Sequence, residues 1–116
     1  MITLTIPDCP PGLNKLLRMS RFRRAALQKL WRRWIWAARC QARLGPPTPP
    51  QRAKVSIHRT GVKLLDKDNL YGGVGKIICD ALKANQFIMD DSPKHIELTC
   101  TQEVGVVGVR VTVEGG

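Results

Sequence analysis

A long amphipathic segment with prolines on both sides most constrains what this chain can fold into. Ser20 can cap a helix that runs to about Leu44, and the apolar positions recur at spacings of three and four. These positions are Leu27, Leu30, Trp31, Trp34 and Ala38, with Ile35 interrupting the basic opposite face. Pro10-Pro11 precedes the segment and Gly45-Pro46-Pro47-Thr48-Pro49-Pro50 follows it as a stiff connector. We expect the helix to cover a sheet, with its tryptophans in the core.

Shorter alternating segments supply that sheet. Residues 2–6 and 53–58 alternate apolar and polar side chains, as strands with one buried face do. Residues 87–89 form a short apolar run that predicts a strand. Residues 95–102 and 107–113 predict a hairpin around Val104-Gly105.

The segments between the strands predict loops and one more helix. Pro10–Asn14 predicts a rigid loop and Arg59–Gly61 a turn or bulge, after which Val62–Leu65 can continue the strand. Residues 71–75 are too rich in glycine for a stable helix. We therefore expect the second helix over about 74–84, with core positions Ile77, Ile78, Ala81 and Leu82.

These elements predict an α+β fold with a small mixed sheet of about four to five strands and two main helices, in the order β-α-β-α-β-β. The 116 residues fit a single domain over residues 1–116. No apolar run suits a membrane span, and the N-terminus lacks a secretory signal. The four cysteines have no zinc-ligand spacing, which favours reduced thiols in a cytosolic protein.

The charge of the chain is strongly positive and uneven. Nineteen Lys and Arg against nine Asp and Glu give a formal net charge of +10. Fourteen basic residues and no acidic residue lie between Cys9 and Leu65. Such a cationic half attracts a polyanion, because each neutralised phosphate releases a condensed counterion. Nucleic acid is the favoured partner; an anionic membrane and a basic face kept for solubility are the alternatives.

Two acidic clusters fall at predicted strand ends. Asp66 and Asp68 are two residues apart, so in extended backbone their side chains share one face. Asp90 and Asp91 follow the apolar run 87–89, and a strand, a helix and a returning strand can bring the two clusters together. Close carboxylates repel one another unless a cation lies between them. The clusters therefore suggest a divalent metal site.

Mg²⁺ and Mn²⁺ bind to a small number of carboxylate oxygens and complete their coordination with water and substrate phosphate. Such a metal can activate water and stabilise the leaving oxygen of a phosphodiester. Beside a basic surface, the acidic clusters indicate a metal-dependent nuclease. The alternative is that Asp66 and Asp68 cap turns and that Asp90-Asp91 begin a loop before Pro93. Spacing alone does not choose between these interpretations.

Three segments in order resemble the RusA-type Holliday junction resolvases, a family of crossover junction endodeoxyribonucleases. The segments are Asp66-Lys67-Asp68-Asn69-Leu70, then Lys76-Ile77-Ile78-Cys79-Asp80-Ala81-Leu82, then Asp90-Asp91. They match an Asp-x-Asp-Asn-Leu segment, a helix with Lys-x-x-x-Asp-Ala-Leu, and an apolar run that ends in Asp-Asp. The opening strand followed by Pro10–Asn14 is also similar. Residues 71–75 are an extra glycine-rich piece before Lys76.

The resemblance implies roles for individual residues. Asp66, Asp68 and Asp91 correspond to metal ligands for Mg²⁺ or Mn²⁺, and Asp90 to a secondary or structural carboxylate. Lys76 corresponds to a functional lysine that stabilises negative charge in the transition state. Its alternative role is an i,i+4 salt bridge with Asp80 on the helix surface. We expect Asn69 to cap a helix or order the loop.

The resemblance also implies an activity and its partners. These are paired phosphodiester hydrolysis in four-way DNA junctions during recombination and repair, by a homodimer in the cytoplasm of a bacterial or phage-infected cell. Phosphate contacts should set recognition of the branched shape. The expected DNA-binding residues are Lys15, Arg18, Arg21, Arg24, Arg32 and Lys67. We expect no membrane and no protein partner beyond the second copy.

Two other functions use the same features. A non-catalytic basic nucleic-acid-binding module needs the positive surface but no convergent carboxylates. A membrane-surface helix over residues 20–44 would use its arginines and tryptophans together.

Overall fold

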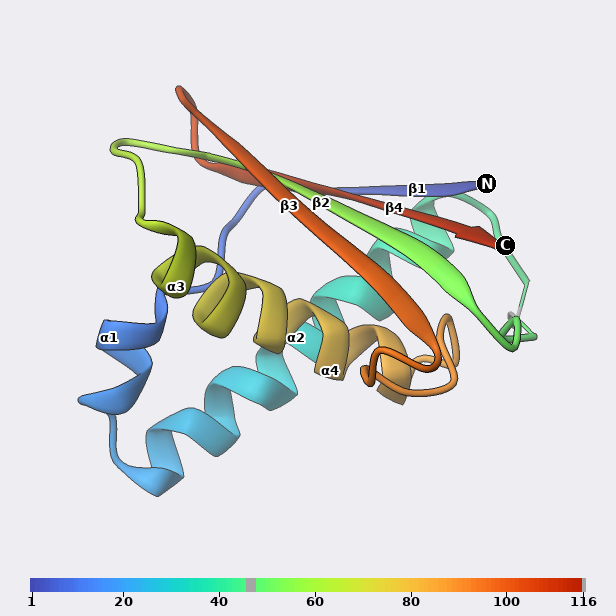
Figure 1. Cartoon of the computed structure of the whole chain (residues 1–116), viewed down its shortest axis with the longest axis horizontal. Helices are drawn as coiled ribbons and strands as arrows, with labels where there is room; N and C mark the ends of the chain where they lie inside the picture. The colour runs from blue at the N-terminus through green and yellow to red at the C-terminus, as the bar shows by residue number, and fades with distance from the viewer. Residues whose placement is uncertain (46–47, 116) are drawn as a thin grey trace.

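The computed structural model describes residues 1–45 and 48–115, so Pro46 and Pro47 of the predicted connector lie outside the described residues (Figure 1). Its elements, in chain order, are β1 (Ile2–Ile6), α1 (Leu13–Leu17), α2 (Arg21–Gln41), β2 (Ala53–Gly61), α3 (Lys67–Asn69), the π-helical η1 (Leu70–Gly75), α4 (Lys76–Ala84), β3 (Ile96–Val104) and β4 (Gly108–Gly115). The predicted α+β class is confirmed.

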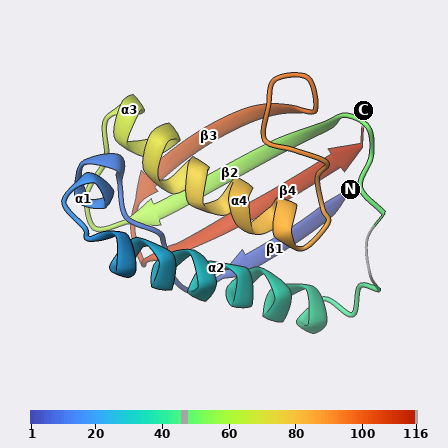
Figure 2. The same cartoon turned by 90° about the horizontal axis from the view of Figure 1, so that it is seen from below.

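The four strands form one mixed sheet in the order β1-β4-β2-β3. β2 and β3 are parallel, whereas β4 runs antiparallel to both β1 and β2. The helices lie together on one face of this sheet, with α2 and α4 side by side beneath it (Figure 2). The described residues therefore form two layers, and none of their helices covers the other face of the sheet.

The predicted hairpin of the last two strands is wrong, because β2 lies between β3 and β4. After β2 a helical connection returns the chain, so that β3 pairs with β2 in parallel. β3 is an edge strand because it pairs with no other strand of the sheet. The following connection passes the end of β2, where the Gly105 amide donates to the Gly61 carbonyl at 2.9 Å. β2 also continues through Arg59–Gly61, which we expected to be a turn or bulge, and Val62–Leu65 do not extend it.

The core lies between the helices and the sheet. α4 buries Ile77, Ile78, Ala81 and Leu82, as predicted. α2 begins after Ser20, whose hydroxyl accepts from the Arg23 amide at 3.2 Å. Its buried residues are Trp31, Ile35 and Ala38, whereas Leu30 is 45% exposed. Ile35 therefore belongs to the buried face and not to the basic one, because it lies one turn after Trp31.

Residues 71–75 are helical, against the prediction that their glycines would prevent it. α3, η1 and α4 form one continuous run from Lys67 to Ala84. A side chain at Gly73 would collide with the main chain of Gly12 and Leu13, where α1 meets η1. Tertiary contact with α1 thus stabilises a segment of weak intrinsic helix propensity. α1 itself begins at Leu13, inside the predicted rigid loop.

Residues 87–89 are not a strand but part of the turns after α4. Gln86 has a positive φ of 63°, and the Phe87 amide donates back to the Leu82 carbonyl at 3.0 Å. Phe87 and Ile88 are buried. The apolar run therefore reflects burial at a helix C-terminus and not strand pairing.

Candidate functional site

The first acidic cluster lies at the N-terminus of α3, not at the end of an extended strand. Asp66 caps this helix: its Oδ1 accepts from the Asn69 amide and its Oδ2 from Asn69 Nδ2, both at 2.9 Å. These hydrogen bonds, first that of the Asn69 backbone, lower the pKa of Asp66. Asp68 is exposed in the first turn. Asp66 therefore takes the capping role that was its alternative.

Two side chains from the sheet hold the loop that leads to Asp66. Gln102 of β3 accepts from the Leu65 amide at 2.9 Å and donates to the Leu65 carbonyl at 2.5 Å. Arg59 of β2, only 8% exposed, donates through Nη1 to the Lys63 carbonyl at 2.9 Å. The backbone before the acidic cluster is thus fixed by the sheet.

Neither Arg59 nor Gln102 was among the predicted site residues. We expected a turn or bulge at Arg59, but the alternation of Ala53, Val55 and Ile57, carried two residues further, would have placed this arginine on the buried face of β2. No comparable signal identified Gln102, because its role depends on a loop that lies 37 positions earlier in the chain.

Asn69 connects the acidic cluster to α1. Its Oδ1 accepts from the Asn14 amide at 2.8 Å while its Nδ2 donates to Asp66. The expectation that Asn69 orders the loop is confirmed.

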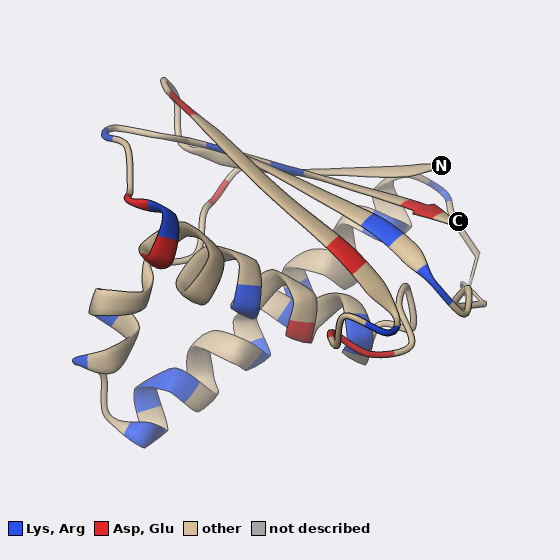
Figure 3. Ribbon diagram, in the orientation of Figure 1, with Lys and Arg blue, Asp and Glu red and all other residues tan. Residues whose placement is uncertain are grey.

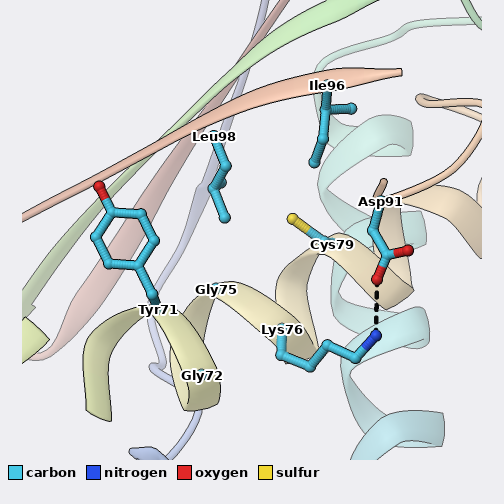
Figure 4. A pocket seen from close by; sticks show the side chains of 8 residues that line it. All are labelled: Tyr71, Gly72, Gly75, Lys76, Cys79, Asp91, Ile96 and Leu98. Atoms are coloured by element: carbon cyan, nitrogen blue, oxygen red, sulfur yellow. Dashed lines mark hydrogen bonds and ion pairs between the residues drawn. The ribbon is translucent and has the colours of Figure 1, made fainter. Parts of the chain in front are cut away.

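The second acidic cluster is held by lysines of α4. Lys76 Nζ lies 2.7 Å from Asp91 Oδ2 (Figure 4). The same ammonium lies 3.2 Å from Asp80 Oδ1. The hydrogen bond to Asp91 is the main cause of the raised pKa of Lys76. About two helical turns later, Lys83 Nζ lies 3.1 Å from Asp90 Oδ1, and this hydrogen bond lowers the pKa of Asp90. Both carboxylates of the Asp90-Asp91 turn are therefore bound to α4.

Lys76 thus makes the i,i+4 salt bridge with Asp80 that was its alternative role, and it also contacts Asp91 of the second cluster. The contact with Asp91 joins two of the three segments that carry the family resemblance.

A small cavity of about 200 Å³ adjoins this ion pair between η1, α4 and β3. Tyr71, Cys79, Ile96 and Leu98 give it mostly apolar walls, with Lys76 and Asp91 at one side (Figure 4). Burial raises the pKa of Cys79 to about 12 and that of Cys100 to about 11. Both thiols are therefore protonated at neutral pH and are poor nucleophiles and metal ligands.

The predicted metal ligands are not gathered within one chain. Across residues 1–45 and 48–115, no group of three or more His, Cys, Asp or Glu side chains is placed to hold a metal ion. The acidic residues of α3 lie apart from those of the loop after α4 (Figure 3). Carboxylates suit Mg²⁺ or Mn²⁺ chemically, but Asp91 and Asp80 already form ion pairs with the Lys76 ammonium. In this single chain Asp66, Asp68, Asp90 and Asp91 do not form one metal-binding group among the described residues, and their role as ligands stays a prediction.

The predicted DNA-binding residues lie on three neighbouring helices. Lys15 and Arg18 belong to α1 and its C-cap, Arg21, Arg24 and Arg32 to α2, and Lys67 to α3. All six side chains are exposed, and none forms an ion pair within the described part of the chain. Figure 3 shows basic positions along α1 and α2 and one on α3, beside acidic positions of the same short helix.

The tryptophans of α2 differ in burial. Trp31 is buried, as predicted, and Trp34 is half-buried against it with ring centroids 6.5 Å apart. Trp36 is 54% exposed, so the expectation of a core position is wrong for this residue. It faces away because it lies outside the Trp31–Ile35–Ala38 face.

No protein-family model matches this chain, and no curated protein matches it with significant similarity. Among the described residues, the helices lack the combination of length and apolar character that a membrane crossing requires.

Proposed function

We propose that the protein is a metal-dependent, structure-specific endodeoxyribonuclease of the RusA type. In this proposal a cytoplasmic homodimer resolves four-way DNA junctions by paired phosphodiester hydrolysis. The observation that carries it is the 2.7 Å contact between Lys76 and Asp91. Fifteen positions separate these residues in the chain, and the resemblance assigns both to the catalytic set.

The positive surface supports the DNA-binding part of the proposal. The exposed cations of α1, α2 and α3 can contact phosphates without first breaking an ion pair of the described chain. Phosphate contacts fix the position and orientation of DNA without reading its sequence, as recognition of a branched shape requires.

The acidic residues and Lys76 have distinct parts in this proposal. Asp68 is an exposed carboxylate beside the Asp66 cap, on a loop that the sheet holds in place. The raised pKa of Lys76 keeps its ammonium protonated at neutral pH, so it can stabilise negative charge on a phosphate.

A synthetic four-way junction tests the proposal. We expect nicking of the junction, and not of a linear duplex, in the presence of Mg²⁺ or Mn²⁺ and none in EDTA. Asp68→Asn should abolish nicking and leave junction binding intact or tighter, because a negative charge near the phosphates is removed. Glu114→Gln, an exposed change on β4, is the matched control and should retain nicking.

A non-catalytic nucleic-acid-binding module is the second candidate, favoured by the absence of a three-carboxylate group in the described residues. Junction binding with no nicking at any Mg²⁺ or Mn²⁺ concentration would select it. Nicking by Asp68→Asn at the wild-type rate would refute the proposed catalytic role of Asp68.

A further inference from the structure

A second cavity, of about 490 Å³, lies between α1, the loop that follows β2, and α3. Its walls carry three cationic side chains, those of Lys15, Arg18 and Lys63, together with Asn14 and Asn69. Among the described residues that line it, none carries a carboxylate. Lys63 was not among the predicted DNA-binding residues, and nothing in its sequence surroundings distinguishes it from other exposed lysines.

The walls of this cavity are held by hydrogen bonds from the rest of the fold. Asn69 accepts from the Asn14 amide at 2.8 Å, which joins α3 to α1. The buried Arg59 holds the Lys63 carbonyl at 2.9 Å, which fixes the backbone that carries the Lys63 side chain. The cavity is therefore formed before any ligand binds, and a ligand need not order this loop.

The charges around the cavity are unbalanced. Lys15, Arg18 and Lys63 are exposed, and none forms an ion pair with a described residue of the chain. Three like charges around one hollow repel one another, and a bound anion relieves that repulsion. Lysine and arginine are the usual partners of phosphate oxygens.

We propose that this cavity seats a phosphodiester group of the bound DNA strand. The inference rests on the proposed function for the identity of the ligand. Asn69 links the cavity wall to Asp66, so the seated phosphate lies beside the acidic cluster and fixes where the strand passes it. The cavity thus sets the register of the strand, whereas the arginines of α2 add affinity along its length.

Junction binding in EDTA tests the seat without requiring catalysis. The variant Lys15→Gln/Lys63→Gln and the control Lys54→Gln/Lys94→Gln lose the same charge, and all four residues are exposed. Fluorescence anisotropy over a NaCl series should show roughly 10-fold weaker binding for the first variant and a salt slope smaller by about 1. Circular dichroism should show that both variants fold. Equal weakening of the two variants would overturn the seat and leave the nuclease proposal intact.

An NMR titration separates the possible sources of phosphate. We expect the amides of Lys15, Lys63 and Asn69 to shift with the dinucleotide d(TpT) at lower concentration than with inorganic phosphate. A response to inorganic phosphate alone, or to neither probe, would overturn the assignment. Wild-type junction binding without nicking would defeat the proposed activity but not the seat, because both readouts are free of metal and of cleavage.

Discussion

The two main helices, α2 and α4, lie side by side on one face of the sheet, yet they differ in whether their basic side chains form ion pairs. α2 carries seven basic residues and no acidic one, and none of the seven forms an ion pair within the described residues. On α4, Lys76 and Lys83 each bind a carboxylate within 3.1 Å or less. Two neighbouring helices therefore use their basic side chains differently: α4 uses them in ion pairs within the chain, and α2 does not among the described residues.

The basic residues of α4 form ion pairs within the molecule, whereas most of those of α2 are exposed to solvent. The lysines of α4 hold the Asp90-Asp91 turn against the helix, so their charge is used inside the molecule. The cations of α2 find no such partner in the described chain, and their field extends into solvent. An external polyanion would provide the missing negative charge.

The largest expected effect comes from removing the charge of α2. The triple variant Arg21→Gln/Arg24→Gln/Arg32→Gln should weaken junction binding by about two to three orders of magnitude at 0.1 M salt. Each phosphate contact contributes about 0.9 to the slope of the logarithm of the binding constant against the logarithm of salt concentration, which is about a factor of ten between about 1 M and about 0.1 M salt. Fluorescence anisotropy measures the change. Lys54→Gln/Lys94→Gln/Arg110→Gln is the matched control, and an equal loss there would show that α2 is not special.

A smaller effect tests whether the helices differ only on their outer faces. Trp31→Ala on α2 should lower the free energy of unfolding by about 3–5 kcal/mol and Leu82→Ala on α4 by about 2–5 kcal/mol, since both side chains are fully buried. Urea unfolding measures both. Phe22→Ala, at a position 81% exposed, should change it by less than about 0.5 kcal/mol. A cost confined to one helix would mean that the core is not shared.

The smallest effect concerns the ion pairs of α4. Lys76→Met should lower stability by well under about 1 kcal/mol at pH 7, because the Lys76 side chain is 55% exposed and solvent screens its charge. The pKa of Lys76 is raised in the folded state, so its contribution is complete below the unfolded pKa and disappears as pH rises through the folded pKa. Urea unfolding at pH 7 and pH 11 should show this pH dependence in the wild type and less of it in the variant. A loss of several kcal/mol at pH 7 would contradict this screening of the Lys76 ion pairs by solvent.

Local patterns predicted the elements that local interactions determine. The alternation over residues 2–6, the Ser20 cap and the core face of α4 are all found in the structure. The position of β4 between β1 and β2 could not be read in the same way, because strand pairing depends on residues far apart in the chain. The helical glycine segment likewise depends on its contact with α1.

The candidate site also combines contacts that local spacing predicts with contacts that depend on distant segments. The salt bridge of Lys76 with Asp80 follows from their i,i+4 spacing. The contact of Lys76 with Asp91 needs the turns after α4, and the Leu65–Gln102 hydrogen bonds need the parallel return of β3. The expected strand-end geometry of Asp66 and Asp68 failed because the strand stops at Gly61 and the carboxylates begin a helix.

The glycine contact between α1 and η1 has a consequence for the surface as a whole. Gly73 touches the main chain of Gly12 and Leu13, so backbone meets backbone at this junction. Rotamer changes, which move exposed side chains in picoseconds to nanoseconds, leave such a separation unaltered. Substitution of the charged groups on α1 and α3 can therefore change the affinity for a phosphate while the distance between α1 and η1 stays the same. Alanine at position 73 would instead push α1 and η1 apart.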